Sequence, residues 1–154
     1  MIISVFPSIG KTYAYNKMKN DKKLKVFDSD SSQFSWTYVS DNEKIRNENF
    51  PTNYIAHIKE NMDNATHIFV SSHENVRQAM KTAEIPYILV YPRRDMLPEI
   101  VGRCYLRGNN EQFIKTLIEN WDNWIDSCET DTGAIDKFEI GNGMYLLDVL
   151  ELIK

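Results

Sequence analysis

The sequence predicts a three-layer α/β/α fold, in which a parallel sheet of about five strands lies between two layers of helices. Short apolar segments alternate with longer segments of helical pattern, and this order is typical of parallel sheets joined by crossover helices. Several of the apolar segments contain consecutive apolar residues, as strands buried on both faces do. The length of 154 residues fits a single domain spanning residues 1–154.

The strands are short, β-rich segments that end at turn residues. The predicted strands lie at residues 2–6, 24–27, 65–70, 86–91 and near 138–140. Pro7 and Gly10 follow the first strand, and Pro92 follows the fourth. Open parallel sheets bind ligands beyond the carboxyl ends of their strands. The informative residues should therefore be those after the first four strands, at 7–12, 28–32, 71–73 and 93–95.

The helices are segments with apolar residues at helical spacing. The predicted helices span residues 11–20, 50–61, 74–83, 98–107 and 110–127, and a last amphipathic segment begins at Tyr145. Pro51 fits the first turn of its helix, and His73 is expected to cap the helix that follows it. Residues 33–48 are polar with interspersed aromatics, and no pattern in the sequence places them.

Composition and charge exclude several protein classes. Apolar residues make up 42% of the chain, charged residues 26%, and the net charge is −4, as in a globular domain and unlike a disordered chain. The mild acidity argues against general nucleic-acid binding. No apolar stretch approaches the ~18 residues that cross a bilayer, and no signal peptide is recognisable. We therefore expect a soluble cytoplasmic protein without membrane partners, either a monomer or a homodimer.

Cysteine and histidine residues show no metal-site or redox pattern in this sequence, although His73 could contact a phosphate instead of capping its helix. Cys104 and Cys128 have apolar, helix-like surroundings and do not form a C-x-x-C pair, which predicts free thiols. His57, His67 and His73 lie at unrelated positions, so no metal-site spacing is present.

The segment VFPSIGKT at residues 5–12 follows the first strand and opens the first helix. A phosphate-binding Walker A loop reads G-x-x-x-x-G-K-[ST], so Gly10, Lys11 and Thr12 match its end, whereas Val5 replaces its first glycine. The N–H groups of such a loop and of a helix N-terminus hold anions. Lys11 would reach the β- and γ-phosphates of ATP and the Thr12 hydroxyl would bind Mg²⁺. The expected ATP-binding residues are Ser8, Ile9, Gly10, Lys11, Thr12 and Tyr13. The alternative is an ordinary strand–turn–helix unit with a solvated lysine.

Two carboxylates, Asp28 and Asp30, follow the second strand. Residues at i and i+2 of an extended segment point to the same side. Beside a magnesium–nucleotide complex they would join the metal shell or accept a proton from a substrate hydroxyl. The alternative is a loop in which these side chains bind nearby N–H groups. Ser31, Phe34 and Trp36 come next and would help to bind the substrate, although the two aromatic rings could equally fix the loop.

Four arginines form the third group: Arg93, Arg94, Arg103 and Arg107. Arg103 and Arg107 are four residues apart and share one helix face. Phosphoryl transfer needs cations around the moving phosphate, so these two are candidate catalytic residues and Arg93 is a candidate substrate ligand. The alternative is a solvated helix face with Glu99 and Glu111 as partners.

At these residues the chain resembles the adenylate-kinase-like branch of P-loop kinases, and within it the nucleotide-kinase-like proteins of phages and prophages of Gram-positive bacteria. Residues 6–12, 28–32, 70–73 and 107–109 carry the resemblance. It implies a P-loop NTPase fold, a small helical lid at about 93–110 and a MgATP-dependent nucleoside or deoxynucleoside monophosphate kinase, working in the host cytoplasm if encoded by a phage. The catalytic residues would be Lys11, Asp28, Asp30, Arg103 and Arg107.

Two other functions stay open at this point. The Asp28–Asp30 pair looks like the D-x-D of shikimate-kinase-type enzymes, whose acceptor is a hydroxyl. The third strand ends in Val70-Ser71-Ser72 without a Walker B aspartate, and the first loop glycine is missing. These two departures from the pattern leave room for a degenerate nucleotide-binding phage protein with an interaction role.

Overall fold

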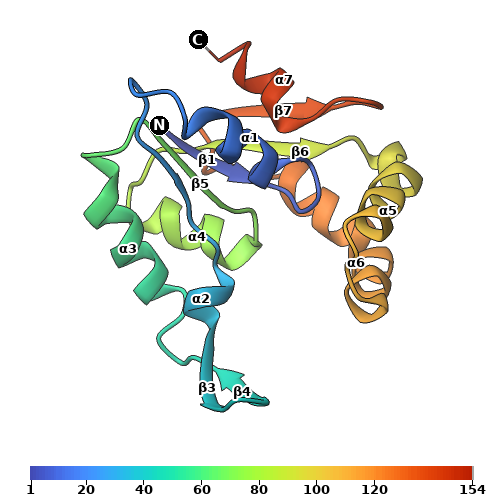
Figure 1. Cartoon of the computed structure of the whole chain (residues 1–154), viewed down its shortest axis with the longest axis horizontal. Helices are drawn as coiled ribbons and strands as arrows, with labels where there is room; N and C mark the ends of the chain where they lie inside the picture. Colours follow the sequence, from blue (N-terminus) through green and yellow to red (C-terminus); the bar gives the residue numbers. More distant parts are fainter. Residues whose placement is uncertain (154) are drawn as a thin grey trace.

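A five-stranded, all-parallel sheet forms the centre of the molecule, as seen in a computed structural model that describes residues 1–153 (Figure 1). Its strands are β1 (Ile2–Val5), β2 (Val26–Asp28), β5 (His67–Ser71), β6 (Ile88–Pro92) and β7 (Asp136–Ile140). They lie in the order β2-β5-β1-β6-β7. The central strand β1 is buried along its whole length, which explains why its sequence shows consecutive apolar residues.

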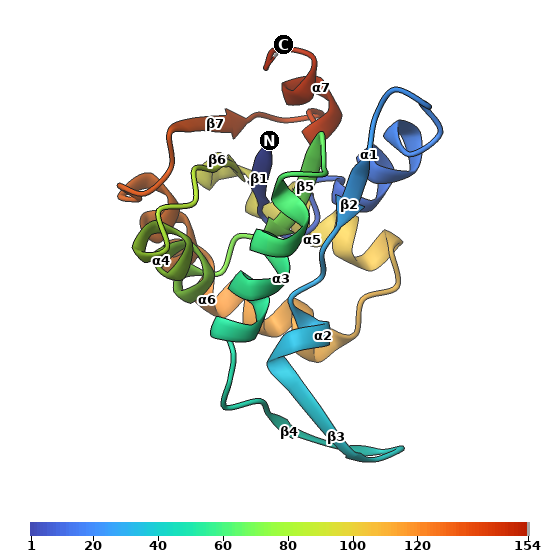
Figure 2. The same ribbon diagram turned by 90° about the vertical axis from the view of Figure 1, so that its left-hand side faces the viewer.

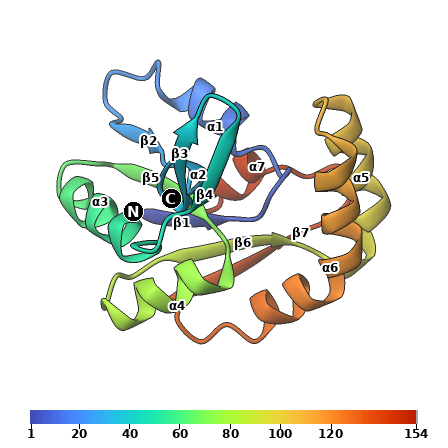
Figure 3. The same ribbon diagram turned by 90° about the horizontal axis from the view of Figure 1, so that it is seen from below.

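Helices cover both faces of this sheet (Figures 1 and 3). One face carries α1 (Lys11–Met18) and α7 (Leu146–Leu150). The other carries α3 (Thr52–Met62), α4 (Glu74–Thr82) and α6 (Glu111–Glu129). The three-layer α/β/α arrangement expected from the sequence is therefore present. None of the helices within residues 1–153 combines the length and the apolar character needed to cross a bilayer.

The segment at about 93–110 contains a short 3₁₀ helix, η1 (Arg94–Met96), and helix α5 (Leu97–Leu106). Ile100 and Cys104 of α5 are fully buried in the core, and α5 packs against α6. The far end of α5 is exposed at Leu106 and Arg107. The segment is thus anchored to the domain by one face and free at its end.

The segment with no readable pattern, residues 33–48, forms an arm that projects from the domain (Figure 2). It consists of α2 (Ser32–Ser35) and a hairpin of β3 (Trp36–Ser40) and β4 (Glu43–Arg46). Lys44 Nζ and the Arg46 guanidinium lie 4.3 and 4.2 Å from the centre of the Trp36 ring. Every hairpin residue from 37 to 46 is exposed, so the arm shows no alternation of apolar and polar positions that could reveal its strands.

Two strands differ from their expected bounds for local reasons. Residue 24 belongs to a turn, because its N–H donates to Asp21 O at 3.0 Å, and β2 starts at Val26. Strand β7 begins at Asp136 rather than near 138. It lies at the edge of the sheet, and its first residues are exposed, so they lack the apolar pattern that would have revealed the start of the strand. Both cysteines are buried and free, as expected.

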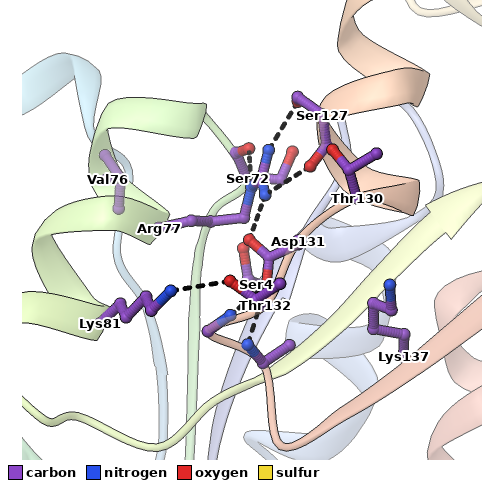
Figure 4. Close-up of polar contacts among 12 residues, drawn as sticks. Ser4, Ser72, Val76, Arg77, Lys81, Ser127, Thr130, Asp131, Thr132 and Lys137 are labelled. Carbon is purple, nitrogen blue, oxygen red and sulfur yellow. Dashed lines mark hydrogen bonds and ion pairs between the residues drawn. The ribbon is translucent and has the colours of Figure 1, made fainter.

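A buried ion pair joins Arg77 of α4 to Asp131, which lies in the turn between α6 and β7 (Figure 4). Arg77 also donates to Ser72 O at 2.9 Å and to Ser127 Oγ at 2.6 Å. Asp131 accepts from the Tyr87 hydroxyl at 3.0 Å and from the backbone N–H groups of residues 133 and 134 at 3.0 and 2.8 Å. Each buried charge is therefore hydrogen-bonded as well as paired, the condition under which such a pair is tolerated in a protein interior.

Candidate functional site

The β1–α1 loop, residues 6–10, has the geometry of an anion site. Gly10 has a φ of +102°, a conformation that glycine adopts without strain, and a Cβ there would approach Tyr145 Cδ1 to 3.2 Å. Within residues 1–153, none of the N–H groups of residues 8–13 donates to an acceptor. Consecutive unpaired N–H groups that run into a helix N-terminus attract anions such as phosphate.

Lys11 and Thr12 stand at the first turn of α1, beside this loop. Lys11 Nζ donates to Asp28 Oδ1 at 2.6 Å, and the two side chains are only 24% and 20% exposed. The Thr12 hydroxyl has no partner within residues 1–153, and Thr12 lines both cavities described below. The first turn thus presents one cation and one free hydroxyl next to the unpaired N–H groups.

Tyr54 and His57 of α3 hold the loop after β2 in place through contacts with Ser29. The Tyr54 hydroxyl donates to Ser29 O at 2.6 Å and accepts from Ser71 N at 3.3 Å, so it joins the carboxyl ends of β2 and β5. Burial holds the pKa of Tyr54 well above its usual value, which keeps the phenol protonated as a donor. His57 Nε2 lies 3.0 Å from Ser29 Oγ. These contacts hold Asp28 and Asp30 at the sheet edge.

Asp28 and Asp30 differ in their partners. Asp28 is paired with Lys11, whereas Asp30 Oδ1 accepts from Ser32 N at 2.9 Å. The hydrogen bond of Asp30 matches the alternative predicted from the sequence, in which the side chains of this loop bind nearby N–H groups. Within residues 1–153, Asp30 Oδ2 has no partner.

An inner cavity of about 260 Å³ lies between the β1–α1 loop and the ends of β2 and β5. The strands β1 and β5 are neighbours, but the chain leaves β1 toward α1 on one face and leaves β5 toward α4 on the other. Such a switch point is where open α/β sheets bind ligands. The charged and titratable residues that line the inner cavity are Lys11, Asp28, Asp30, His73 and Arg107.

An outer cavity of about 670 Å³ adjoins the inner one, and Ser8, Thr12 and Arg107 line both. The remaining wall of the outer cavity comes from α1, α5 and the start of α7. It includes Tyr13, Arg103, Leu106, Tyr145 and Asp148. The volume lies within the range of about 300–1,000 Å³ that is usual for small-molecule and cofactor sites.

Arg103 is the most unusual side chain of the outer cavity, because it is only 8% exposed and incompletely paired. Its Nη2 donates to Glu99 Oε1 and to Met144 O, and its guanidinium lies 3.9 Å from the centre of the Tyr145 ring. Its Nε and Nη1 are buried without any partner in the described chain. Buried unpaired donors are rare in native proteins. Here Glu99, Met144 and Tyr145 enclose the guanidinium, so these two nitrogens have no surface open to the cavity.

The structure brings together most residues singled out in the sequence. Ser8, Gly10, Lys11, Thr12, Tyr13, Asp28, Asp30, Ser31, Arg103 and Arg107 all line one or both cavities. Ile9 is buried and contributes its backbone to the loop, where Ile9 O accepts from Leu146 N at 2.8 Å.

Three expected substrate residues lie outside the cavity walls. Phe34 packs on the rings of Tyr54 and His57, with centroid distances of 5.1 and 4.8 Å. Trp36 belongs to the projecting hairpin. Arg93 forms an ion pair with Asp95 through its Nε at 3.1 Å.

His73 does not cap α4 as expected. It occupies the N-cap position, but its side chain makes no capping hydrogen bond, and it lines the inner cavity instead. Withdrawal from water lowers the pKa of His73 below its ordinary value, and the positive charge of Arg46 lowers that pKa further.

Tyr145 and Asp148 line the outer cavity but were not among the residues predicted from the sequence. A signal was available, because residues 141–148 follow β7 in the same way that the inspected segments follow the first four strands. The rule that ligands bind beyond the carboxyl ends of parallel strands covers the fifth strand too.

Comparison with known proteins extends the description of the fold only. No protein-family model matches the chain, and no curated protein matches it. Among solved structures, an uncharacterized protein from Eubacterium ventriosum is similar, with a TM-score of 0.50 and 12% sequence identity over 99% of this chain and 95% of that one. At this identity the likeness concerns the fold alone.

Proposed function

We propose that the chain is a MgATP-dependent phosphotransferase of the P-loop kinase type. The observation that carries this proposal is the row of unpaired N–H groups at residues 8–13, placed beside Lys11 where the two cavities adjoin. In this proposal the triphosphate of ATP lies along the loop, the nucleoside occupies the outer cavity, and the acceptor enters the inner cavity.

The residues present fit both ATP and Mg²⁺. The outer cavity has the volume of a cofactor site, and Arg103 and Arg107 in its wall supply positive charge for a nucleotide. In P-loop enzymes the hydroxyl of the loop Ser or Thr helps to hold Mg²⁺ against the phosphates, and the free Thr12 hydroxyl would suit that role. The ion would neutralise charge on the phosphates.

The acceptor implied by the resemblance is a nucleoside or deoxynucleoside monophosphate, and the rival acceptor is a small hydroxyl compound. Arg107 supports transfer to either acceptor, because it lines both cavities and would contact the group that moves between them. A nucleotide-binding protein without catalytic turnover would show ATP binding but no ADP release with any acceptor.

The first prediction tests ATP binding at the loop. Lys11→Ala should weaken ATP binding about 10- to 100-fold, because a hydrogen bond to a charged group contributes about 1.5–3 kcal/mol. Titration calorimetry measures the affinity, and circular dichroism confirms the fold. Lys22→Ala, at an exposed position outside both cavities, should bind ATP like the parent. Equal affinity in Lys11→Ala and the parent contradicts the proposal.

A further inference from the structure

We infer that the phosphoryl acceptor is a small uncharged hydroxyl compound and that Asp30 takes the proton from its hydroxyl. This inference rests on the proposed function and names the acceptor class of the same site. It follows from the distribution of charge in the inner cavity.

Both cations of the inner cavity belong to the donor side. Lys11 is at the start of α1, next to the N–H groups that would hold the triphosphate. Arg107 lines the outer cavity as well as the inner one, so it lies between the two. With both Lys11 and Arg107 engaged by the phosphates of ATP, neither side chain is available to bind a negatively charged acceptor.

The wall opposite the loop carries hydroxyls and a carboxylate. It is formed by Asp30, Ser31, Ser71, Ser72 and His73. His73, at the start of α4, is an exposed imidazole whose pKa is lowered below its ordinary value, while the nearby Asp30 acts to raise that pKa. Among the described residues this wall offers no lysine or arginine to an acceptor.

A monophosphate would meet unfavourable electrostatics at this wall. It carries a charge of about −1.5 to −2 at pH 7, and phosphate recognition normally relies on arginine or lysine. Asp30 would instead repel it. A neutral hydroxyl compound avoids this repulsion and finds hydrogen-bond partners in the serine hydroxyls and the carboxylate.

The charged and titratable groups around Asp30 come from several elements. They are Lys11 of α1, Asp28 of β2, Arg46 of β4, Tyr54 of α3, His73 before α4 and Arg107 after α5. Arg46 is the further cation of this region. It does not line the inner cavity, and its guanidinium lies over the Trp36 ring at 4.2 Å.

Size points to the same class of acceptor. The inner cavity of about 260 Å³ lies below the range of about 300–1,000 Å³ that is usual for sites enclosing drug-sized ligands. The terminal phosphate of ATP would fill part of it. The remaining space suits a small polyol or sugar.

Asp30 is the carboxylate available for proton transfer. Its Oδ1 accepts from Ser32 N, and its Oδ2 has no partner in residues 1–153, whereas Asp28 is held in the ion pair with Lys11. The acceptor oxygen forms a bond to the γ-phosphorus while the bond from that phosphorus to the β–γ bridging oxygen breaks, and ADP leaves. The hydroxyl proton passes to Asp30 Oδ2 and then to solvent.

The experiment is an ADP-release screen with MgATP against two panels, with the phosphorylated product identified by mass spectrometry. One panel contains the common nucleoside and deoxynucleoside monophosphates, and the other contains nucleosides, sugars and polyols. We expect phosphorylation of a compound in the second panel and of none in the first.

Two variants test the role of Asp30. Asp30→Asn should lower transfer to the hydroxyl acceptor by about 100-fold or more, the usual contribution of a general base, while its ATP affinity by calorimetry stays that of the parent. Asp21→Asn is the matched control, because Asp21 Oδ1 accepts from Lys23 N at 2.9 Å in the same kind of turn and lines neither cavity. It should be fully active.

Phosphorylation of a monophosphate, full transfer activity in Asp30→Asn, or ATP binding without phosphorylation of any compound would each overturn the inference. The first two outcomes leave the proposed phosphotransferase function in place. Failure of the parent protein to bind ATP would instead overturn the proposed function together with the inference.

Discussion

At the scale of single residues, Arg103 and Arg107 have different surroundings although they lie four residues apart. Arg103 is buried, pairs with Glu99 and stacks on Tyr145. Arg107 is exposed at the end of α5 and has no side-chain partner within residues 1–153. Helical spacing predicted a shared face, but not that the turn before α7 covers one arginine and leaves the other free.

The freedom of Arg107 leads to a kinetic prediction. If Arg107 contacts the phosphoryl group mainly in the transition state, Arg107→Ala should lower kcat about 100-fold or more and change KM for ATP much less. Steady-state ADP release measures both constants. The control is Arg94→Ala, since Arg94 lies outside both cavities and pairs with Asp122 and Glu129. A tenfold rise in KM at unchanged kcat would mean that Arg107 binds ATP equally in the ground state and the transition state, which contradicts the prediction.

At the scale of elements, the sequence predicted what depends on local pattern. The inner strands β1, β5 and β6 were recognisable because burial on both faces demands consecutive apolar residues, and the segment at residues 5–12 was recognisable because its chemistry is local. The position of Tyr145 after β7 indicated only that it lies at the carboxyl edge of the sheet. Its place beside the β1–α1 loop depends on the fold, where Leu146 N donates to Ile9 O.

The β3–β4 hairpin could not be predicted, because it lacks the buried apolar positions that reveal the strands of the sheet. Its residues 37–46 are exposed, so no core selects an apolar face. An isolated two-stranded hairpin is only marginally stable in water, and this one joins the domain mainly through its base, where Asn47 N donates to Ser35 O at 3.0 Å.

Exposure of the hairpin gives a prediction for its removal. When residues 37–45 are replaced by an Asn-Gly turn between Trp36 and Arg46, the free energy of unfolding should change by no more than about 1 kcal/mol, because exposed residues contribute little. Urea unfolding followed by circular dichroism measures it. ATP affinity should also stay the same, since these residues line neither cavity. A loss of several kcal/mol would show that the hairpin stabilises the core.

At the scale of the whole molecule, the Arg77–Asp131 pair joins stability to the site (Figure 4). It connects α4, the end of α6 and the turn before β7. Arg77 also donates to Ser72 O, and Ser72 lines the inner cavity. The same buried network therefore holds a helix layer in place and positions the loop after β5.

The network predicts how stability depends on pH. Burial alone would raise the pKa of Asp131, but hydrogen bonds from Ala134 N–H, Arg77 and Tyr87 outweigh burial and lower that pKa below its ordinary value. A lowered pKa in the folded state means that the charged carboxylate stabilises the protein above about pH 4, the usual value for Asp, and that this stability is lost as the pH falls through the folded-state pKa.

Asp131→Asn should therefore cost about 3–5 kcal/mol at pH 7, where it leaves the Arg77 charge buried without its partner. The difference in unfolding free energy between parent and Asp131→Asn should narrow in acid, because the parent carboxylate then becomes protonated too. Urea unfolding at a series of pH values from 7 downward measures this difference. Asp122→Asn, at a 79% exposed partner of Arg94, should cost less than about 1 kcal/mol at pH 7. A gap for Asp131→Asn that stays constant as the pH falls would show that the carboxylate charge contributes no net stability.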